Sequence, residues 1–354
     1  HMCIRDSLVL DRANMLLSRG EREKAVALCQ AALQVSPDLA RAYFLLGKAA
    51  LEAGDATAAT EHLERSVALD PDNFAARLEL GLLYESQGDM EKAYAHLQHA
   101  DPQEANHELW LRAWPYFNSG RTQAGLDALE LIIRLNPKDT NARYVLAEQL
   151  RLLKRYDEAL AAYDALRRAA PGDVRFFIGR GQLYADQGRG DAAIADLETA
   201  VGQAPRNAEA WFYLGLFRWR FRKDAAGAVA ALEQAVALSP NAWYAGELGN
   251  VQRDSGNLEA AAAAYELAVT LSGRSAYTWW SLGQIYERQE RWEKAATAYA
   301  EAVRQEPGNA WLHAALAHAC ERAGERDKAL AEYQAALALQ PGQAEWLEAV
   351  ERLK

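Results

Sequence analysis

The side chains with the clearest potential for chemistry are three histidines. His96 and His99 are three residues apart in what reads as one helix, and His62 precedes them at a matching place in an earlier helix. A zinc site needs three or four ligands in a suitable geometry, and this spacing does not supply one. We therefore interpret the three histidines as solvated surface side chains and expect no metal site.

A second candidate is the segment G-R-G-D-A-A at residues 188–193, which matches the glycine pattern of a dinucleotide-binding turn. That pattern binds a cofactor only when a strand precedes it and a sheet surrounds it. Here a helical pattern precedes it, so we read Gly188 as a turn between helices. The sequence contains no phosphate-binding loop, nucleophile elbow or H-E-x-x-H motif. We expect no catalytic residue, no cofactor and no enzymatic activity.

Composition narrows the classes of partner. The 354 residues carry a net charge of −10, whereas a protein that binds nucleic acid normally has a basic face, so we expect no nucleic-acid partner. No run of 18 or more apolar residues is present, so we expect no transmembrane segment. Cys29 and Cys320 fall at core positions, and three cysteines do not form a disulfide framework. Both the cytoplasm and the periplasm are consistent with this composition.

The segment from Ala276 to Asn309 shows which elements would position a site. Its first half carries Trp, Leu-Gly and Tyr on one side of a helix, and its second half carries Ala, Tyr and Ala on one side of another. Proline then ends the second helix, because it has no N–H and its ring clashes with the preceding turn. These residues are Trp279, Leu282, Gly283, Tyr286, Ala295, Tyr299, Ala302 and Pro307.

This pattern resembles the tetratricopeptide repeat, a 34-residue helix–turn–helix unit, with Tyr299 at the place of the usual Phe. Most of the chain consists of copies of it. Glycines such as Gly54 and Gly256 mark the turn inside a repeat. We place ten repeat starts at Asp6, Ala40, Phe74, Asn106, Thr140, Val174, Ala208, Ala242, Ala276 and Ala310. The resemblance implies an all-α, right-handed superhelix, or α-solenoid.

We divide the chain into residues 1–5 (a tag remnant and disordered N-terminus), 6–105 (repeats one to three), 106–343 (repeats four to ten) and 344–354 (a capping helix). The boundary at 105 follows from a third repeat two residues short, with Pro102 at its end and Pro115 inside the next helix. A second irregularity lies at residues 219–224, where the turn between the two helices is one residue longer than in the other repeats. In the capping helix, Trp346, Leu347, Val350 and Leu353 form one apolar stripe.

The resemblance also implies where a ligand would bind. Positions 2, 5, 9, 12 and 13 of each first helix line the concave groove of a tetratricopeptide superhelix. The chain lacks the Lys, Asn and Arg set of family members that clamp a C-terminal carboxylate, although Asn250 has one of the places. The candidate groove residues are Trp110, Trp114, Phe117, Tyr144, Arg151, Phe212, Trp219, Arg220, Trp243, Asn250, Arg253, Tyr277, Trp280, Arg288, Trp311 and Arg322.

Two interpretations of these aromatic residues remain open. The rings pack between neighbouring first helices, or they form an open groove in which Trp, Tyr and Arg act as binding hot spots. On the second interpretation the protein is a non-catalytic scaffold that binds an extended peptide or a partner protein. One alternative is a periplasmic scaffold that binds a polysaccharide in a bacterial exopolysaccharide export system. Another is the regulatory arm of a larger enzyme.

Overall fold

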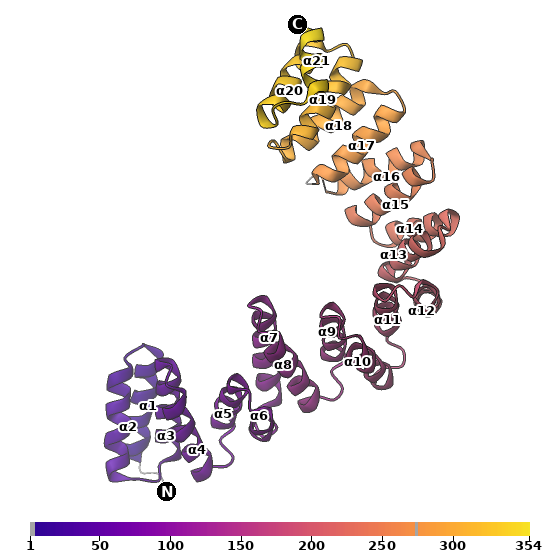
Figure 1. The fold of residues 1–354 in the computed structure, drawn as a ribbon. Helices are drawn as coiled ribbons and strands as arrows, with labels where there is room; N and C mark the ends of the chain where they lie inside the picture. The colour runs from indigo at the N-terminus through magenta and orange to yellow at the C-terminus, as the bar shows by residue number, and fades with distance from the viewer. Residues whose placement is uncertain (1–3, 273–274) are drawn as a thin grey trace. The chain divides into compact units, whose positions relative to one another are not determined.

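The computed structural model describes residues 4–272 and 275–354, with side chains from residue 7 onward. Every regular element in these ranges is a helix (Figure 1), as predicted. Residues 1–3, and with them most of the expected tag remnant, lie outside the described part. None of the described helices combines the length and the apolar character that a bilayer-spanning segment needs.

The chain divides into two compact units, residues 1–173 and 174–354. Unit 1 contains α1 (Ile4–Ser18), α2 (Arg22–Val35), α3 (Ala40–Ala53), α4 (Ala56–Leu69), α5 (Phe74–Gln87), α6 (Met90–Leu97), α7 (Pro102–Asn118), α8 (Thr122–Leu135), α9 (Thr140–Leu152) and α10 (Tyr156–Ala169).

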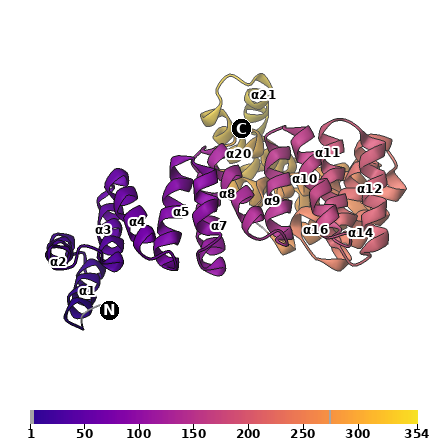
Figure 2. The same cartoon turned by 90° about the horizontal axis from the view of Figure 1, so that it is seen from below.

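Unit 2 contains α11 (Arg175–Asp186), α12 (Gly190–Gln203), α13 (Ala208–Phe217), α14 (Ala225–Leu238), α15 (Ala242–Asp254), α16 (Leu258–Leu271), α17 (Ala276–Arg288), α18 (Trp292–Gln305), α19 (Ala310–Arg322), α20 (Arg326–Leu339) and α21 (Ala344–Leu353). A five-residue π-helical turn, η1 (Arg218–Arg222), follows α13. In each unit, successive helices pack as pairs (Figure 2).

The predicted repeat register is confirmed in most repeats. Helices α3, α5, α9, α13, α15, α17 and α19 begin at the predicted first residues, and α11 begins one residue after Val174. The predicted turn glycines also have the expected backbone, with φ of +75° at Gly54 and +82° at Gly256. In three repeats a residue with a side chain occupies this left-handed turn instead: Lys154, Lys223 and Glu290.

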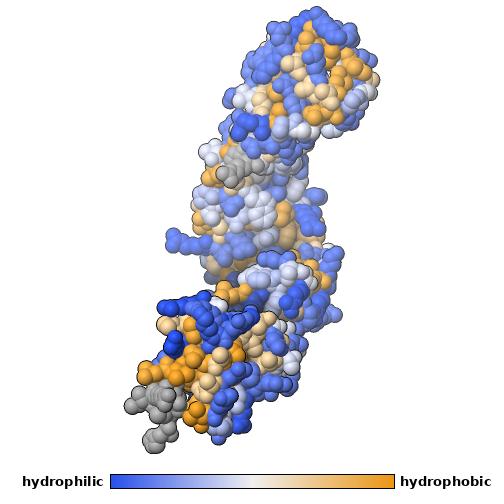
Figure 3. All heavy atoms as spheres, turned by 90° about the vertical axis from the view of Figure 1, so that its left-hand side faces the viewer, coloured by the Kyte–Doolittle hydropathy of each residue, from blue (hydrophilic) through white to orange (hydrophobic). Residues whose placement is uncertain are grey.

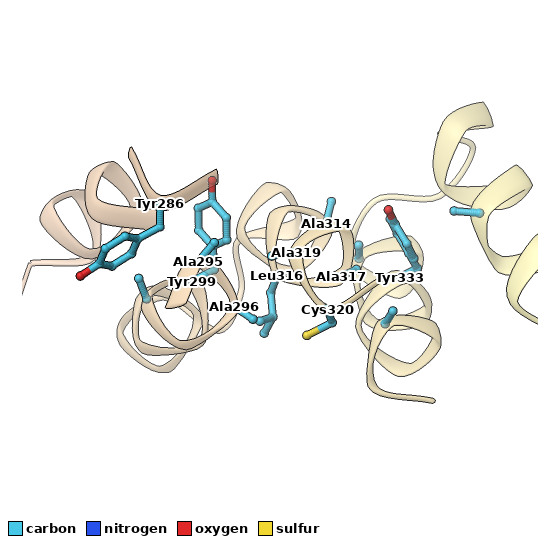
Figure 4. Close-up of a cluster of buried hydrophobic side chains, with 14 of the residues drawn as sticks. Tyr286, Ala295, Ala296, Tyr299, Ala314, Leu316, Ala317, Ala319, Cys320 and Tyr333 are labelled. Atoms are coloured by element: carbon cyan, nitrogen blue, oxygen red, sulfur yellow. The ribbon is translucent and has the colours of Figure 1, made fainter. Parts of the chain in front are cut away.

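Small residues allow the two helices of each repeat to pack closely. In unit 2, the Tyr265 and Tyr299 rings lie against Gly249 and Gly283, where an added Cβ would come within 2.8 Å and 2.6 Å of ring carbons. Ala295, in the same helix as Tyr299, is fully buried. Figure 4 shows this alternation of tyrosine rings with alanines across α17–α20. The predicted core positions of Cys29 and Cys320 are confirmed, since both are buried.

The irregular repeats differ from the prediction in detail. Pro102 does not end a repeat; it is the first residue of α7, where its missing N–H costs nothing, and Asp101 caps that helix. Helix α6 is correspondingly short, and α7 continues on both sides of Pro115. The extra residue expected near Trp219 is accommodated by the π turn η1, which is wider than a turn of α-helix.

Helix α21 packs against α20 and covers the end of the last core, with Trp346, Val350 and Leu353 buried. The expected stripe was wrong at one position: Leu347 is exposed, and Ala349 is buried in its place. The difference follows from helix geometry, since Trp346, Ala349, Val350 and Leu353 recur at spacings of three and four.

Candidate functional site

Three aromatic side chains in unit 2 occupy the same position in consecutive repeats. Trp243, Tyr277 and Trp311 are the second residues of α15, α17 and α19, and they are 53%, 54% and 61% exposed. We call them the aromatic row. At the matching position α13 has Glu209 and α21 has Glu345, so the row is bounded by an acidic residue in the repeat on each side. Aromatic side chains exposed in series are unusual on a surface that binds nothing.

A hollow of about 260 Å³ lies between the first two members of the row. Its walls come from α15, from the end of α16 and from the start of α17. The residues that matter for its chemistry are Trp243, Gly246, Glu247, Asn250, Ser275 and Tyr277. We call it the first hollow. Gly246 leaves it open, because a Cβ placed there would have no neighbour within 4 Å.

Hydrogen bonds fix the polar side of the first hollow. The Oδ1 atom of Asn250 accepts from the Tyr265 hydroxyl at 2.6 Å and from the Tyr277 hydroxyl at 3.5 Å. Its Nδ2 donates to the Glu247 carboxylate at 3.3 Å. Burial raises the pKa of Tyr265, which keeps that hydroxyl protonated as a donor. Asn250 therefore has a fixed orientation, and it holds the carboxylate beside the aromatic row.

A second hollow, of about 360 Å³, lies between Tyr277 and Trp311. All seven of its lining positions are those of the first hollow moved along by one repeat of 34 residues. Trp280 occupies the position of Gly246, Glu306 that of Ser272, and Asn309 that of Ser275. The two hollows are thus the same feature in consecutive repeats, formed with different side chains.

Asn309 organises the second hollow. It caps α19, because its Oδ1 accepts from the Trp311 backbone N–H at 3.2 Å, and its Nδ2 donates to the Glu306 carboxylate at 3.2 Å. The Trp280 ring lies 5.9 Å from the Tyr277 ring, at an angle of 40°. The second hollow therefore has three aromatic walls and one carboxylate, and one end of the row is supported by Trp346, whose ring meets Trp311 edge-on at 5.1 Å.

The structure brings six predicted groove residues together around these hollows. Trp243, Asn250, Tyr277, Trp280 and Trp311 line them, and Arg253 lies next to Tyr277. Burial alone would lower the pKa of Arg253, but hydrogen bonds to Asp254 and Tyr277 raise it above the usual arginine value. Arg253 is therefore charged and already paired, with Asp254 at 2.9 Å.

Other predicted groove residues of unit 2 have different surroundings. Phe212 is a correction: it is fully buried, with its ring 4.2 Å from Trp243 and stacked on Tyr244 at 4.5 Å, so it supports the row from below. Arg220 and Arg322 stack on rings outside the row, those of Phe221 and Trp292. Trp219 lies in the π turn and Arg288 is exposed in the last turn of α17.

The remaining five predicted residues belong to unit 1 and form no part of the row. Trp114 is 46% exposed and meets Phe117 edge-on at 6.1 Å, while Trp110 and Phe117 pack against the core of unit 1. Tyr144 is partly buried in α9, where Arg151 pairs with Glu148 at 3.0 Å. Two histidines also differ from expectation: His62 and His96 are partly buried, beside the Tyr43 and Tyr84 rings respectively, rather than fully solvated.

Sequence reasoning missed Gly246, Glu247, Glu306 and Asn309. The signal for Asn309 was available, because Asn at the start of a helix is a strong N-cap residue. Gly246 could have been recognised as the one glycine at a position that is aromatic in α13 and α17.

Within the ranges that the structure describes, no group of three His, Cys, Asp or Glu side chains could hold a metal ion. Figure 3 shows one face of the molecule, on which hydrophobic areas are interspersed with hydrophilic ones.

Tetratricopeptide repeat models match residues 10–73, 50–113, 111–174, 178–242, 247–310 and 286–353. The mouse (Mus musculus) superkiller complex protein 3 is 23% identical over 266 residues, which cover 72% of this chain and only 17% of that protein. Among solved structures, PilF of Pseudomonas aeruginosa is 16% identical over 61% of this chain and 100% of its own, with a TM-score of 0.49. Yeast Tom70 is 14% identical over 99% of this chain and 95% of its own, with a TM-score of 0.41.

Proposed function

Because the chain belongs to the tetratricopeptide repeat family, whose stacked repeats act as protein-interaction scaffolds, we propose that unit 2 binds an extended segment of a partner protein along the aromatic row. The binding is non-catalytic. The observation that carries the proposal is the row itself: three aromatic side chains at one repeat position, each more than half exposed, with a hollow between each neighbouring pair.

Physical chemistry favours an occupied row. An exposed tryptophan leaves a large apolar area in water, and covering such an area stabilises a complex by about 25 cal/mol per Å². Tryptophan and tyrosine dominate binding hot spots because they combine large area with few rotatable bonds. Both tryptophans of the row are also held from behind, Trp243 by Phe212 and Trp311 by Trp346, so these two side chains lose little freedom on binding.

The test is selection from a library of random-sequence peptides against the immobilised full chain. Peptides that bind the row should lose affinity by roughly 30-fold when Trp243 or Trp311 is replaced by Ala, as at an interface hot spot worth about 2 kcal/mol. Trp114→Ala is the matched control, since Trp114 is a similarly exposed tryptophan in unit 1. Equal losses in all three variants, or no enriched peptide, would refute the proposal.

A further inference from the structure

Resting on the proposed function, we infer that the two hollows bind basic side chains, so that the partner segment presents a lysine or arginine to each. The inference follows from one combination that occurs in both hollows: aromatic walls beside a single carboxylate that pairs with no Lys or Arg among the described residues. The carboxylate comes from a different repeat position in each hollow. The common chemistry is therefore not simply a consequence of the repeated backbone.

In the first hollow the carboxylate belongs to Glu247, one turn after Trp243 on α15. Its hydrogen-bond partner is the neutral amide of Asn250 at 3.3 Å. Within the described ranges, no Lys or Arg nitrogen lies within 4.0 Å of the Glu247 carboxylate, and none of the lining residues is basic. Arg253 is near, but Asp254 already pairs with it. The negative charge of Glu247 therefore remains available to a ligand.

In the second hollow the carboxylate belongs to Glu306, which follows α18. Its partner is again a neutral amide, that of Asn309 at 3.2 Å. The nearest arginine in sequence, Arg304, pairs with Glu301 at 2.6 Å. Among the residues that the structure describes, the lining of this hollow also contains no basic side chain. Each carboxylate is thus fixed by an asparagine three residues away, and no described Lys or Arg side chain neutralises it.

A cation is the ligand group that satisfies both kinds of wall. Lysine and arginine are attracted to the faces of Trp and Tyr rings by the ring quadrupole. They also form charge-assisted hydrogen bonds with a carboxylate, which are stronger than neutral ones. An anionic group, such as the acid of a uronic sugar, would be repelled by Glu247 and Glu306. The chain's charge of −10 acts in the same sense by attracting basic segments at longer range.

The experiment repeats the peptide selection with the carboxylates neutralised as Glu247→Gln and Glu306→Gln. The matched control is Glu233→Gln, which removes the same charge at an exposed place in α14, away from the aromatic row and outside both hollows. We expect wild-type protein to enrich peptides with Lys or Arg, and each hollow variant to bind them roughly 10-fold more weakly, as for the loss of one charged hydrogen bond. The control should bind them as the wild type does, and thermal melts should show all three variants folded.

The outcomes separate this inference from the proposed function. Enriched peptides that lack basic residues, yet lose affinity in Trp311→Ala, would overturn the inference and leave the row as a binding surface. Basic peptides that bind the hollow variants as well as the control would also overturn it, because long-range attraction alone would then explain them. Peptides that bind independently of Trp311 and Trp243 would overturn the proposed function, and the inference with it.

Discussion

Two glycines of α15 should respond in opposite directions to the same substitution. Gly246 and Gly249 lie three residues apart in one helix. A Cβ on Gly246 would have no neighbour within 4 Å, because it would point into the first hollow. A Cβ on Gly249 would lie 2.8 Å from two ring carbons of Tyr265, which is 1% exposed and cannot move aside. The pair therefore tests both the open hollow and the close helix packing beneath it.

The magnitudes follow from two competing effects. Glycine inside a helix costs roughly 0.5–1 kcal/mol relative to alanine, so Gly246→Ala should raise the free energy of unfolding by about that amount. Gly249→Ala gains the same term but overpacks a filled site, which typically costs about 1–3 kcal/mol. We expect Gly249→Ala to lower the free energy of unfolding by up to about 2.5 kcal/mol, once the smaller helix gain is subtracted.

Guanidinium denaturation followed by far-ultraviolet circular dichroism would measure both variants, and hydrogen exchange in α15 and α16 would show whether the change is local. Two results would refute the reasoning. If Gly249→Ala were as stabilising as Gly246→Ala, the Tyr265 ring would not lie as close as the structure has it. If Gly246→Ala were destabilising, the space above Gly246 would not be open, and the first hollow would not exist as described.

Three further predictions use other contacts. Phe212→Ala should lower the free energy of unfolding by about 3–5 kcal/mol, because the ring is fully buried. Trp243→Ala should lower it by less, because half of the Trp243 surface is already in water. The reverse order in denaturation would contradict the burial of Phe212 beneath Trp243. Glu290→Gly should raise the free energy of unfolding by about 0.5–1 kcal/mol, because glycine adopts the left-handed φ of +57° without strain. Thermal melts that show no gain would argue against a left-handed backbone at Glu290. Burial raises the pKa of Glu85 more than Arg112 and Tyr116 lower it, so folding favours the neutral form of this carboxyl group. The stability of the wild type should therefore fall relative to that of Glu85→Gln as the pH rises through the raised pKa. Identical pH profiles for the two proteins would refute this.

The fold was largely predictable because its rules are local. Proline and glycine positions mark helix ends and turns, and the repeat period aligns them, so the first residues of α15, α17 and α19 followed from sequence alone. The errors arose where the local signal has two readings. Pro102 could end one repeat or begin the next helix, and Asp101, an N-cap residue, was the signal for the second.

The candidate site was predictable only as a set of positions. Repeat numbering placed Trp243, Tyr277 and Trp311 together, but it also assigned Phe212 and Trp280 to the same surface with equal weight. The structure separates them by burial: Phe212 is covered by Trp243, while Trp280 forms a wall of the second hollow. Position within a helix fixes the direction of a side chain, but its exposure depends on the neighbouring repeat.

The sequence by itself determined that this chain is a series of helix pairs, where each pair begins, and which small residues let the pairs pack. These features depend on backbone rules and on contacts within one repeat. The tertiary structure alone decided that Gly246 leaves a hollow open and that Asn250 and Asn309 hold Glu247 and Glu306. It also decided that no Lys or Arg among the described residues pairs with either carboxylate. The two asparagine–glutamate hydrogen bonds are local, but the walls of each hollow come from two successive repeats. The distances in both cases depend on side-chain positions that a periodic pattern does not give.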